Sequence, residues 1–304
     1  MATELDLPGN ASAERPWAQR LHDVIDYCRT NPSLVAGLGL LLILILVGVV
    51  GPHIVNPNLA QPTSVKPDQP PSPAYPLGSD DSGRDLIAVV VVGLPLTMEI
   101  GFVAGAIGLV VGTILGFAAG YLGGSVDAVL RTLADMLLTV PSLVVLVTIA
   151  ATLKGNITIV EEAFVVSILA WMWPLRAIRS QVLSLRDRGY VQIAKLSGMR
   201  WDEIIVRELI PNLLPYLAAS FVTSTAAAVL ASIGLELVGL GPQSEPDMGM
   251  TIYWVLQFNA LIRGLWWWWL TPLVCLALFF IALFLASTGL DQLANPRAHR
   301  GGNR

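Results

Sequence analysis

Long apolar stretches, separated by short polar segments, dominate the chain from residue 34 onward. A helix needs about 20 apolar residues to cross the hydrocarbon core of a bilayer. The stretches that we expect to form transmembrane helices are 34–51, 96–122, 129–153, 163–178, 213–240 and 265–287. The pattern therefore predicts an all-α integral membrane protein with six transmembrane helices.

The segment between the first two predicted helices, residues 52–95, contains a proline-dense tract without helical periodicity. Proline removes a backbone donor and disfavours helix interiors, so we expect this tract to be an extended loop in water. The other five helices would form a core over residues 96–288. Two polar segments, 1–33 and 289–304, would flank the membrane region as tails.

The composition also indicates a membrane protein. Of the 304 residues, 54% are hydrophobic and 13% are charged, and the mean hydropathy is +0.66. Soluble proteins carry about 25% charged residues. The net charge of −4 gives no indication of nucleic-acid binding. The first apolar run starts near Leu34, later than in a usual signal peptide, and no small-residue cleavage site follows it, so we expect a retained helix.

Positive charge is distributed unevenly between the two sides that six helices would create. Fourteen of the 18 Lys and Arg residues fall on the side of the chain termini, and seven of them lie between residues 176 and 207. Positively charged residues are enriched in cytoplasmic segments. The charge pattern thus predicts that both termini lie in the cytoplasm and that residues 52–95 lie outside.

The residues that bind metals or form disulfides do not cluster along the chain. Cys28 and Cys275 form no CxxC pattern, and one precedes the first predicted helix whereas the other lies inside the last. The three histidines lie outside the predicted helices, so no pair of haem ligands is expected. We therefore expect no metal site and no cofactor bound by this chain.

One predicted cytoplasmic segment, Tyr190–Pro215, is charged and amphipathic although it lies between two apolar stretches. We expect two short helices separated by Gly198, because glycine tolerates the backbone angles of a sharp turn. In the second helix, apolar residues recur at helical spacing at positions 201, 204, 205 and 209. Composition alone is equally compatible with an interfacial helix on the lipid headgroups.

The spacing within this segment resembles the EAA loop of bacterial ABC importer permeases. In that loop, three residues and then a glycine follow EAA, and a leucine-proline pair comes later. Here Gln192, Ile193 and Ala194 stand at the EAA positions, Gly198 matches the glycine, and Pro211 matches the proline. The glutamine in place of the acidic residue and an isoleucine before the proline depart from the pattern.

Six further motifs, in order along the chain, resemble the dipeptide/oligopeptide permease family, C-subunit type. They are Asn31-Pro32 with Pro52, GSDDSGRDL (78–86), YLGGSVD (121–127), DMLLTVPSL (135–143), GLGP with PDMG (239–249), and GLDQLANPR (289–297). The similarity covers nearly the whole chain from residue 31. It implies a type I ABC importer permease fold in the inner (plasma) membrane of the cell, with a cytoplasmic coupling helix in the loop 190–211.

The resemblance also implies partners. The coupling helix of such permeases seats on a separate cytoplasmic ATPase, and this chain has no G-x-x-x-x-G-K-[ST] loop of its own. The chain is therefore not expected to be an enzyme, and ATP and Mg would be used by partner subunits. The implied partners are a second permease subunit, two ATPase subunits or domains, and an extracytoplasmic substrate-binding protein. The candidate ATPase-coupling residues are Gln192, Ala194, Lys195, Gly198, Trp201 and Asp202.

Candidates for the transport path come from the apolar stretches. Glu99 and Glu236 are carboxylates in such stretches, where an acid is costly and usually faces a cavity or a partner. In the family, the external loop that corresponds to 241–264 lines the outer entrance, although an interfacial loop with aromatic anchors is the simpler alternative. The candidates for contact with the binding protein are Glu245, Asp247, Tyr253 and Trp254.

Two repetitive features have structural explanations as well as functional ones. Trp266–Trp269 fits an interfacial aromatic belt better than a sugar-binding platform, because four consecutive residues point in all directions around a helix. Glycines at GxxxG spacing between Gly101 and Gly120 allow close approach of a helix, either within the chain or from a second permease subunit.

The resulting prediction is a permease subunit of an ATP-driven importer of small solutes. Dipeptides and oligopeptides are the leading cargo, and short oligosaccharides are the alternative. A proton-coupled secondary transporter that uses Glu99 and Glu236 is the alternative from another class, and a structural subunit of a membrane enzyme complex is a third. Six helices are few for a secondary carrier, and the segment Tyr190–Pro215 would have no role in one.

Overall fold

The computed structural model describes residues 31–153 and 156–294. In this part of the chain the regular structure is helical, apart from an isolated β-bridge between Ser79 and Asp85. The α-helices are α2 (Pro32–Ile54), α3 (Leu86–Phe117), α4 (Gly124–Thr139), α5 (Ser142–Ala150), α6 (Ile159–Ala170), α7 (Met172–Leu185), α8 (Gly189–Leu196), α9 (Trp201–Ile204), α10 (Ile210–Leu237), α11 (Met248–Gln257) and α12 (Trp266–Ala294). The shorter segments are the 3-10 helix η1 (Pro57–Ala60) and the π-helices η2 (Ala118–Leu122) and η3 (Ile205–Leu209). Most of the predicted tails 1–33 and 289–304 lies outside the described residues, as does Cys28.

Four helical stretches are long and apolar enough to cross a membrane: α2, α3 with η2, the stretch Trp201–Leu237, and α12. α4 and α5 together form a fifth candidate, and they are bent by 83°. The predicted all-helical membrane fold is thus confirmed. In the described chain, the count of six is not reached on length and composition, because the fourth predicted helix, 163–178, is divided between α6 and α7.

Proline accounts for the bend between α4 and α5 and for the break between α6 and α7. Pro141 precedes α5 at the bend after α4 and follows Val140, which has an extended conformation. Pro174 lies in the first turn of α7 and has no N–H to donate to the carbonyl of Ala170, where α6 ends. A hydropathy pattern reports apolar length and does not report these breaks.

The second membrane helix begins at Leu86 and not at residue 96 as predicted. The side chain of Asp85 caps its first turn by accepting a hydrogen bond from the N–H of Ile87 (3.0 Å). Pro95, which the prediction placed before the helix, lies inside α3. Helix α2 makes room for the proline ring at Gly48, where a Cβ would lie 2.3 Å from Pro95 Cγ.

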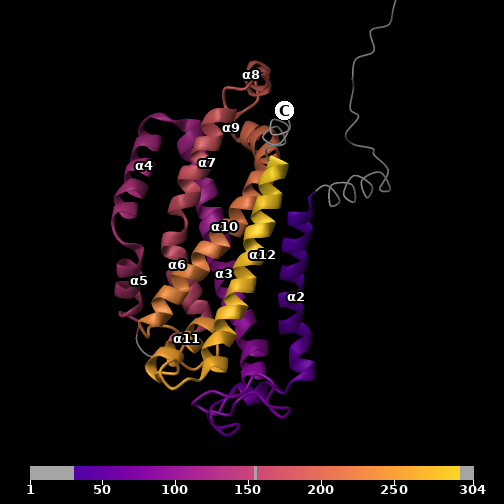
Figure 1. Cartoon of the computed structure of the whole chain (residues 1–304). Helices are drawn as coiled ribbons and strands as arrows, with labels where there is room; N and C mark the ends of the chain where they lie inside the picture. The colour runs from indigo at the N-terminus through magenta and orange to yellow at the C-terminus, as the bar shows by residue number, and fades with distance from the viewer. Residues whose placement is uncertain (1–30, 154–155, 295–304) are drawn as a thin grey trace, which may run out of the picture.

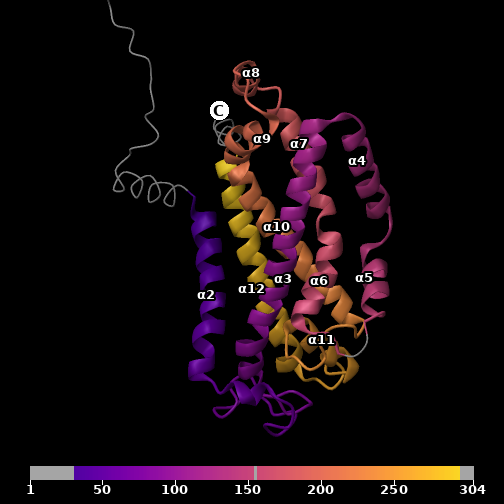
Figure 2. The ribbon, with the colours of Figure 1, turned by 180° about the vertical axis from the view of Figure 1, so that it is seen from behind.

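Helices α3 and α10 run side by side through the middle of the bundle (Figure 1). Helices α12 and α2 pack together at one edge, and α4 and α5 form the opposite edge (Figure 2). Helix α8 lies beyond one end of the bundle, which we call the α8 end. Helix α11 and the loop 55–85 lie at the opposite end, which we call the α11 end.

Close contacts within the chain account for the glycines at the start of the α3 stripe. A Cβ at Gly105 would lie 2.8 Å from the backbone N of Thr225 in α10, and a Cβ at Gly101 would lie 2.4 Å from Val229 Cγ2. The absence of side chains at these positions lets the backbones of α3 and α10 approach closely. The stripe therefore packs internally, which is one of the two explanations offered by its spacing.

Candidate functional site

Helices α8 and α9 form a protrusion at the α8 end (Figure 1). Helix α8 ends in a Schellman motif: the N–H of Met199 donates to the carbonyl of Ala194 (3.2 Å), and the N–H of Gly198 donates to that of Lys195 (3.1 Å). Gly198 has a φ of 80°, in the left-handed region that favours glycine. The predicted turn at Gly198 is confirmed.

The protrusion has one side that packs on the bundle and one that does not. Val191 and Ala194 are buried in the apolar cluster at the α8 end. Ile193, Leu196 and Trp201, in contrast, expose 66%, 88% and 55% of their surface. Exposed apolar side chains gathered in this way mark a surface for another protein or for lipid.

The structure separates the candidate coupling residues into exposed and buried ones. Gln192, Lys195, Gly198 and Trp201 are exposed, Asp202 is half-buried, and Ala194 is buried. Ala194 therefore supports α8 from beneath and does not face outward. The sequence analysis did not single out Leu196 as a candidate and treated Ile193 only as part of the EAA match. Ile193 and Leu196 are three residues apart and so share a face of α8, while Val191 and Ala194 form the buried face; this spacing is the signal that could have identified both.

A buried polar cluster lies at the α11 end, between α6 and α10. Ser232 Oγ lies 2.8 Å from Oε1 of Glu162 and 2.6 Å from Oε1 of Glu236. A serine hydroxyl has one hydrogen and can donate to only one of these carboxyl groups. The other carboxyl group must then donate to Ser232, so the two hydrogen bonds together require a proton on one of the two glutamates. Asp247 interacts with Glu236. We call Glu162, Ser232, Glu236 and Asp247 the acid cluster.

The segment before α11 closes over the acid cluster. Asp247 caps α11 and is fully buried. Gly249 lies against Glu236, since a Cβ at this position would lie 1.5 Å from Glu236 Oε2. The hydroxyl of Thr97 in α3 accepts a hydrogen bond from the N–H of Met248 (2.9 Å). These contacts hold α10, α3 and the start of α11 together.

The two carboxylates predicted for the transport path do not meet. Glu236 is fully buried in the acid cluster, whereas Glu99 is exposed. On a helix, Glu99 lies opposite to Thr97 and Gly101, which face the start of α11 and α10. The structure therefore gives no support to a proton carrier that uses Glu99 and Glu236 in one site.

The candidates for contact with the binding protein also differ in exposure. Glu245, Tyr253 and Trp254 are half-buried, and Asp247 is buried.

Glu162 was not predicted at all. It follows Glu161, which forms a capping box with Thr158 at the start of α6. Acidic residues are common in the first turn of a helix, so the sequence gives no reason to assign Glu162 another role.

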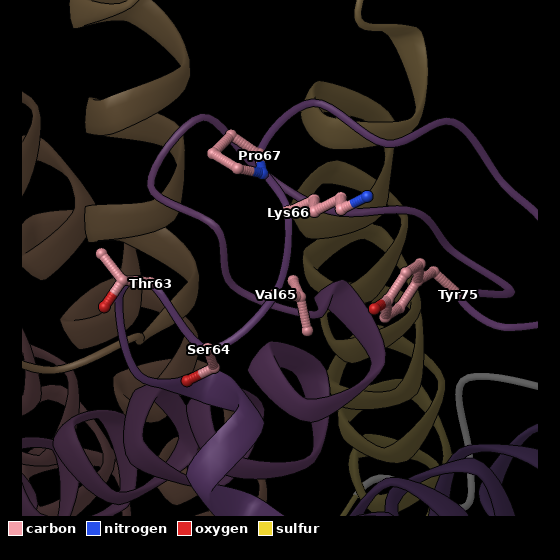
Figure 3. A pocket seen from close by; sticks show the side chains of 6 residues that line it. All are labelled: Thr63, Ser64, Val65, Lys66, Pro67 and Tyr75. Carbon is pink, nitrogen blue, oxygen red and sulfur yellow. The ribbon is translucent and has the colours of Figure 1, made fainter.

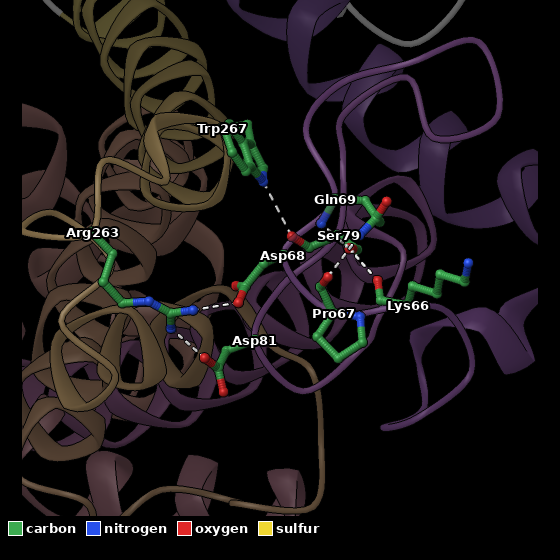
Figure 4. Close-up of polar contacts among 8 residues, drawn as sticks. All are labelled: Lys66, Pro67, Asp68, Gln69, Ser79, Asp81, Arg263 and Trp267. Atoms are coloured by element: carbon green, nitrogen blue, oxygen red, sulfur yellow. Dashed lines mark hydrogen bonds and ion pairs between the residues drawn. The ribbon is translucent and has the colours of Figure 1, made fainter.

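The loop 55–85 is held against the segment between α11 and α12 and against the first turn of α12 (Figure 4). Arg263 forms ion pairs with both Asp68 and Asp81. The indole Nε1 of Trp267 donates a hydrogen bond to the carbonyl oxygen of Ser79 (3.1 Å). These contacts make the loop part of the α11 end.

The four consecutive tryptophans point in different directions, as their spacing predicts. Trp268 is fully buried, Trp266 is 52% exposed, and Trp267 contacts the loop 55–85. They do not form one stacking platform for a sugar.

An open pocket with a volume of about 550 Å³ lies in the loop 55–85 (Figure 3). It is lined by Thr63, Ser64, Val65, Lys66, Pro67 and Tyr75. All of these residues belong to the loop, so the pocket is not part of a path through the helix bundle.

The stability of the loop is expected to depend on pH through Asp80. Burial raises the pKa of Asp80 from 3.8 to about 6, although the N–H and the charge of Arg84 lower it in part. The pKa of Asp80 is higher in the folded than in the unfolded state. Its contribution to the stability of the folded loop is therefore fully present below about pH 4 and is lost as the pH rises through 6. Amide hydrogen exchange at residues 79–85 should be faster at pH 7.5 than at pH 5 after correction for intrinsic rates. Asp80→Asn should remove this difference, and a difference that persists in Asp80→Asn contradicts the assignment.

Arg263→Ala is expected to loosen the loop 55–85 without unfolding the bundle. Exposed ion pairs contribute about 0.2–1 kcal/mol each, and the Arg263 side chain is 37% exposed. Loss of both pairs should speed limited proteolysis within the loop about two- to thirtyfold. Lys66→Ala is the control, because the structure gives Lys66 no ion pair within the described chain. Equal cleavage rates for Arg263→Ala and the unmodified protein would show that the ion pairs do not hold the loop.

The structure is thus a bundle of membrane helices with an apolar protrusion at one end and a closed polar cluster at the other. Residues 112–300 match the family described as binding-protein-dependent transport system inner membrane component. The chain belongs to this family and is a transmembrane permease subunit of such a system.

Individual relatives agree with the family assignment over most of the chain. The dipeptide transport system permease protein DppC of Bacillus subtilis (strain 168) is 26% identical over 293 residues, which cover 95% of this chain and 89% of the relative. The oligopeptide transport system permease protein OppC of Mycobacterium tuberculosis (strain H37Rv) is 29% identical over 266 residues, 88% of this chain and 91% of the relative. The probable D,D-dipeptide transport system permease protein DdpC of Escherichia coli (strain K12) is 28% identical over 298 residues, 96% and 98% of the two chains. The resemblance drawn from the motifs is confirmed.

Proposed function

We propose that this chain is one of two permease subunits of an ATP-driven importer of dipeptides or oligopeptides. We further propose that its α8–α9 protrusion docks on a cytoplasmic ATPase subunit. The observation that carries the proposal is the apolar side of the protrusion. Leu196 is 88% exposed and Ile193 is 66% exposed, although the underside of the same helix is buried.

The proposed docking sets the orientation of the chain. The α8 end lies in the cytoplasm, and the α11 end with the loop 55–85 faces outward. The many arginines between residues 176 and 207 support this orientation. Both termini then lie in the cytoplasm, which requires an even number of crossings. Six crossings result if α4 with α5 is one and α6 with α7 is another.

The energy source lies outside this chain. The sequence has no phosphate-binding loop of the G-x-x-x-x-G-K-[ST] type. ATP and Mg are therefore used by the ATPase subunits, and the chain converts their movement into a change at the α11 end.

The α11 end is the proposed entrance, where an extracytoplasmic binding protein delivers the solute. Glu245, Tyr253 and Trp254 remain the candidates for this contact because they are accessible in part. The relatives named above are all permeases for peptides by name. The acid cluster supports the same cargo, since carboxyl groups attract the amino group of a peptide when the end opens, whereas a neutral oligosaccharide has no such group.

The proposal is tested by purifying this chain through an affinity tag after co-expression with its second permease subunit and ATPase subunits. We expect the ATPase subunits to co-purify. ATP hydrolysis should rise when the binding protein is loaded with peptides and not when it is offered oligosaccharides. Stimulation by oligosaccharides alone would overturn the cargo and keep the importer. Absence of any co-purified ATPase would contradict the importer itself.

A further inference from the structure

The end of α3 and the following η2 pack closely against α7. A Cβ at Gly116 would lie 3.0 Å from Ile178 Cβ, and one at Gly120 would lie 2.8 Å from Val182 Cβ. A side chain at either glycine would clash with α7, so the missing side chains let the two helices pack closely against each other. Helix α7 leads directly into the protrusion, so α3 is tied to the segment just before it.

Arg179 of α7 and Arg186, the C-cap residue of α7, hold the turn between α3 and α4. Arg186 Nη1 donates to the carbonyl oxygen of Gly120 in η2 (3.0 Å). Arg179 donates to both carboxylate oxygens of Asp127 in the first turn of α4, with 2.6 Å between Nη2 and Oδ2. The turn itself is irregular, because it combines a π-helix with a φ of 68° at Gly123. The backbone hydrogen bonds of this turn do not form a regular helix, so the contacts with the two arginines hold its position relative to α7.

The same turn also touches α8. Lys195 Nζ lies 5.6 Å from the ring centroid of Tyr121 in η2. Val191 of α8 and Phe117 of α3 belong to one buried apolar cluster. A displacement of α8 therefore reaches this turn directly as well as through α7.

Helices α4 and α5 connect the turn to the α11 end (Figure 1). After the 83° bend, Leu146 and Ala150 of α5 pack in one cluster with Leu235 of α10. Leu235 is next to Glu236 in the chain. The contacts thus form an unbroken series from α8 to the acid cluster.

On the basis of the proposed function, we propose that Arg179 and Arg186 are positioning residues for energy coupling. They make the turn between α3 and α4 follow α7 when the ATPase moves α8. The α4–α5 pair then carries the displacement to the acid cluster. Arg179 acts through Asp127, and Arg186 acts through the carbonyl of Gly120.

The test uses the complete complex of this chain with its second permease, ATPase subunits and binding protein in lipid vesicles. Peptide uptake and ATP hydrolysis are measured on the same vesicles and give the number of peptides imported per ATP. Arg179→Asp and Asp127→Arg are compared with the double variant that exchanges the two charges. The matched control exchanges Arg176 and Asp135, which pair the same two helices at 3.4 Å with side chains 48% and 47% exposed.

Each single variant should lower the peptides imported per ATP about tenfold, within the range of energetic couplings between distant sites. The exchanged pair should recover about half of the wild-type value or more, and the control exchange should stay within about twofold. Uptake and hydrolysis that fall in proportion in the single variants would show a merely structural role and overturn the inference. An exchanged pair without recovery would overturn it as well.

If Arg179→Asp and Asp127→Arg do not assemble into the complex, Arg179→Lys is the variant that tests the inference. Lysine keeps the charge and loses the two-point contact with Asp127. We expect about a threefold loss of peptides per ATP in this variant, and an unchanged value overturns the inference. If the wild-type vesicles show no ATP-dependent peptide uptake, the proposed function fails and not this inference alone.

Discussion

Leu196→Glu should release the ATPase subunits from this chain while the permease stays folded. The side chain is 88% exposed, so the substitution costs the isolated chain little. In the proposed complex, it removes a buried leucine, worth about 1.5–3 kcal/mol, and buries an unpaired charge. The affinity for the ATPase subunit should fall about 100-fold or more. Co-purification of the ATPase and uptake of labelled peptide both measure the effect.

Ile262→Glu is the matched control for this experiment. Ile262 is 86% exposed, like Leu196, and it lies between α11 and α12 at the opposite end of the chain. This variant should keep the ATPase subunits bound in detergent. If Leu196→Glu also keeps them bound and transports at the wild-type rate, the protrusion is not the docking surface.

Gly249→Ala should disrupt the closed α11 end. The new Cβ would lie 1.5 Å from Glu236 Oε2, far inside van der Waals contact. Overpacking of a buried site costs about 1–3 kcal/mol, and here the neighbouring carboxyl group is itself held by Ser232 (2.6 Å). We expect the melting temperature of the purified chain to fall by a few degrees. Peptide transport should fall further, because α11 can no longer seat on α10.

A second substitution separates this clash from general damage. Glu236→Ala removes the atoms that the new Cβ meets, so Glu236→Ala with Gly249→Ala should be more stable than the sum of the single effects implies. Gly234→Ala is the control, since a Cβ there meets only Leu143 Cδ1, at 3.2 Å, the flexible end of a side chain. Strict additivity of the two single effects would refute the close contact between Gly249 and Glu236.

Hydropathy and motif spacing predicted the parts of this fold that depend on local sequence. The first and last membrane helices, expected at 34–51 and 265–287, are α2 (Pro32–Ile54) and α12 (Trp266–Ala294), and both extend beyond the predicted C-terminal end. The turn at Gly198 was predicted because a left-handed position selects glycine. The family was predicted because several motifs of fixed spacing occur in the right order.

The misplaced boundaries and the missed residue depend on contacts between distant segments. Pro95 was taken as a helix boundary, yet it is accommodated within α3 by Gly48 of another helix. Glu162 lies far in sequence from Ser232, and only the packing of α6 on α10 brings them within 2.8 Å. No periodicity within one segment reports a contact of this kind.

The most direct test of the account is uptake of labelled peptide into vesicles that contain the complete complex. The binding protein is supplied at the α11 end, and ATP is supplied at the α8 end. The account predicts uptake that requires hydrolysable ATP and that persists after the pH gradient across the membrane is collapsed. Uptake driven by a pH gradient in the absence of ATP would contradict it and would identify a secondary transporter.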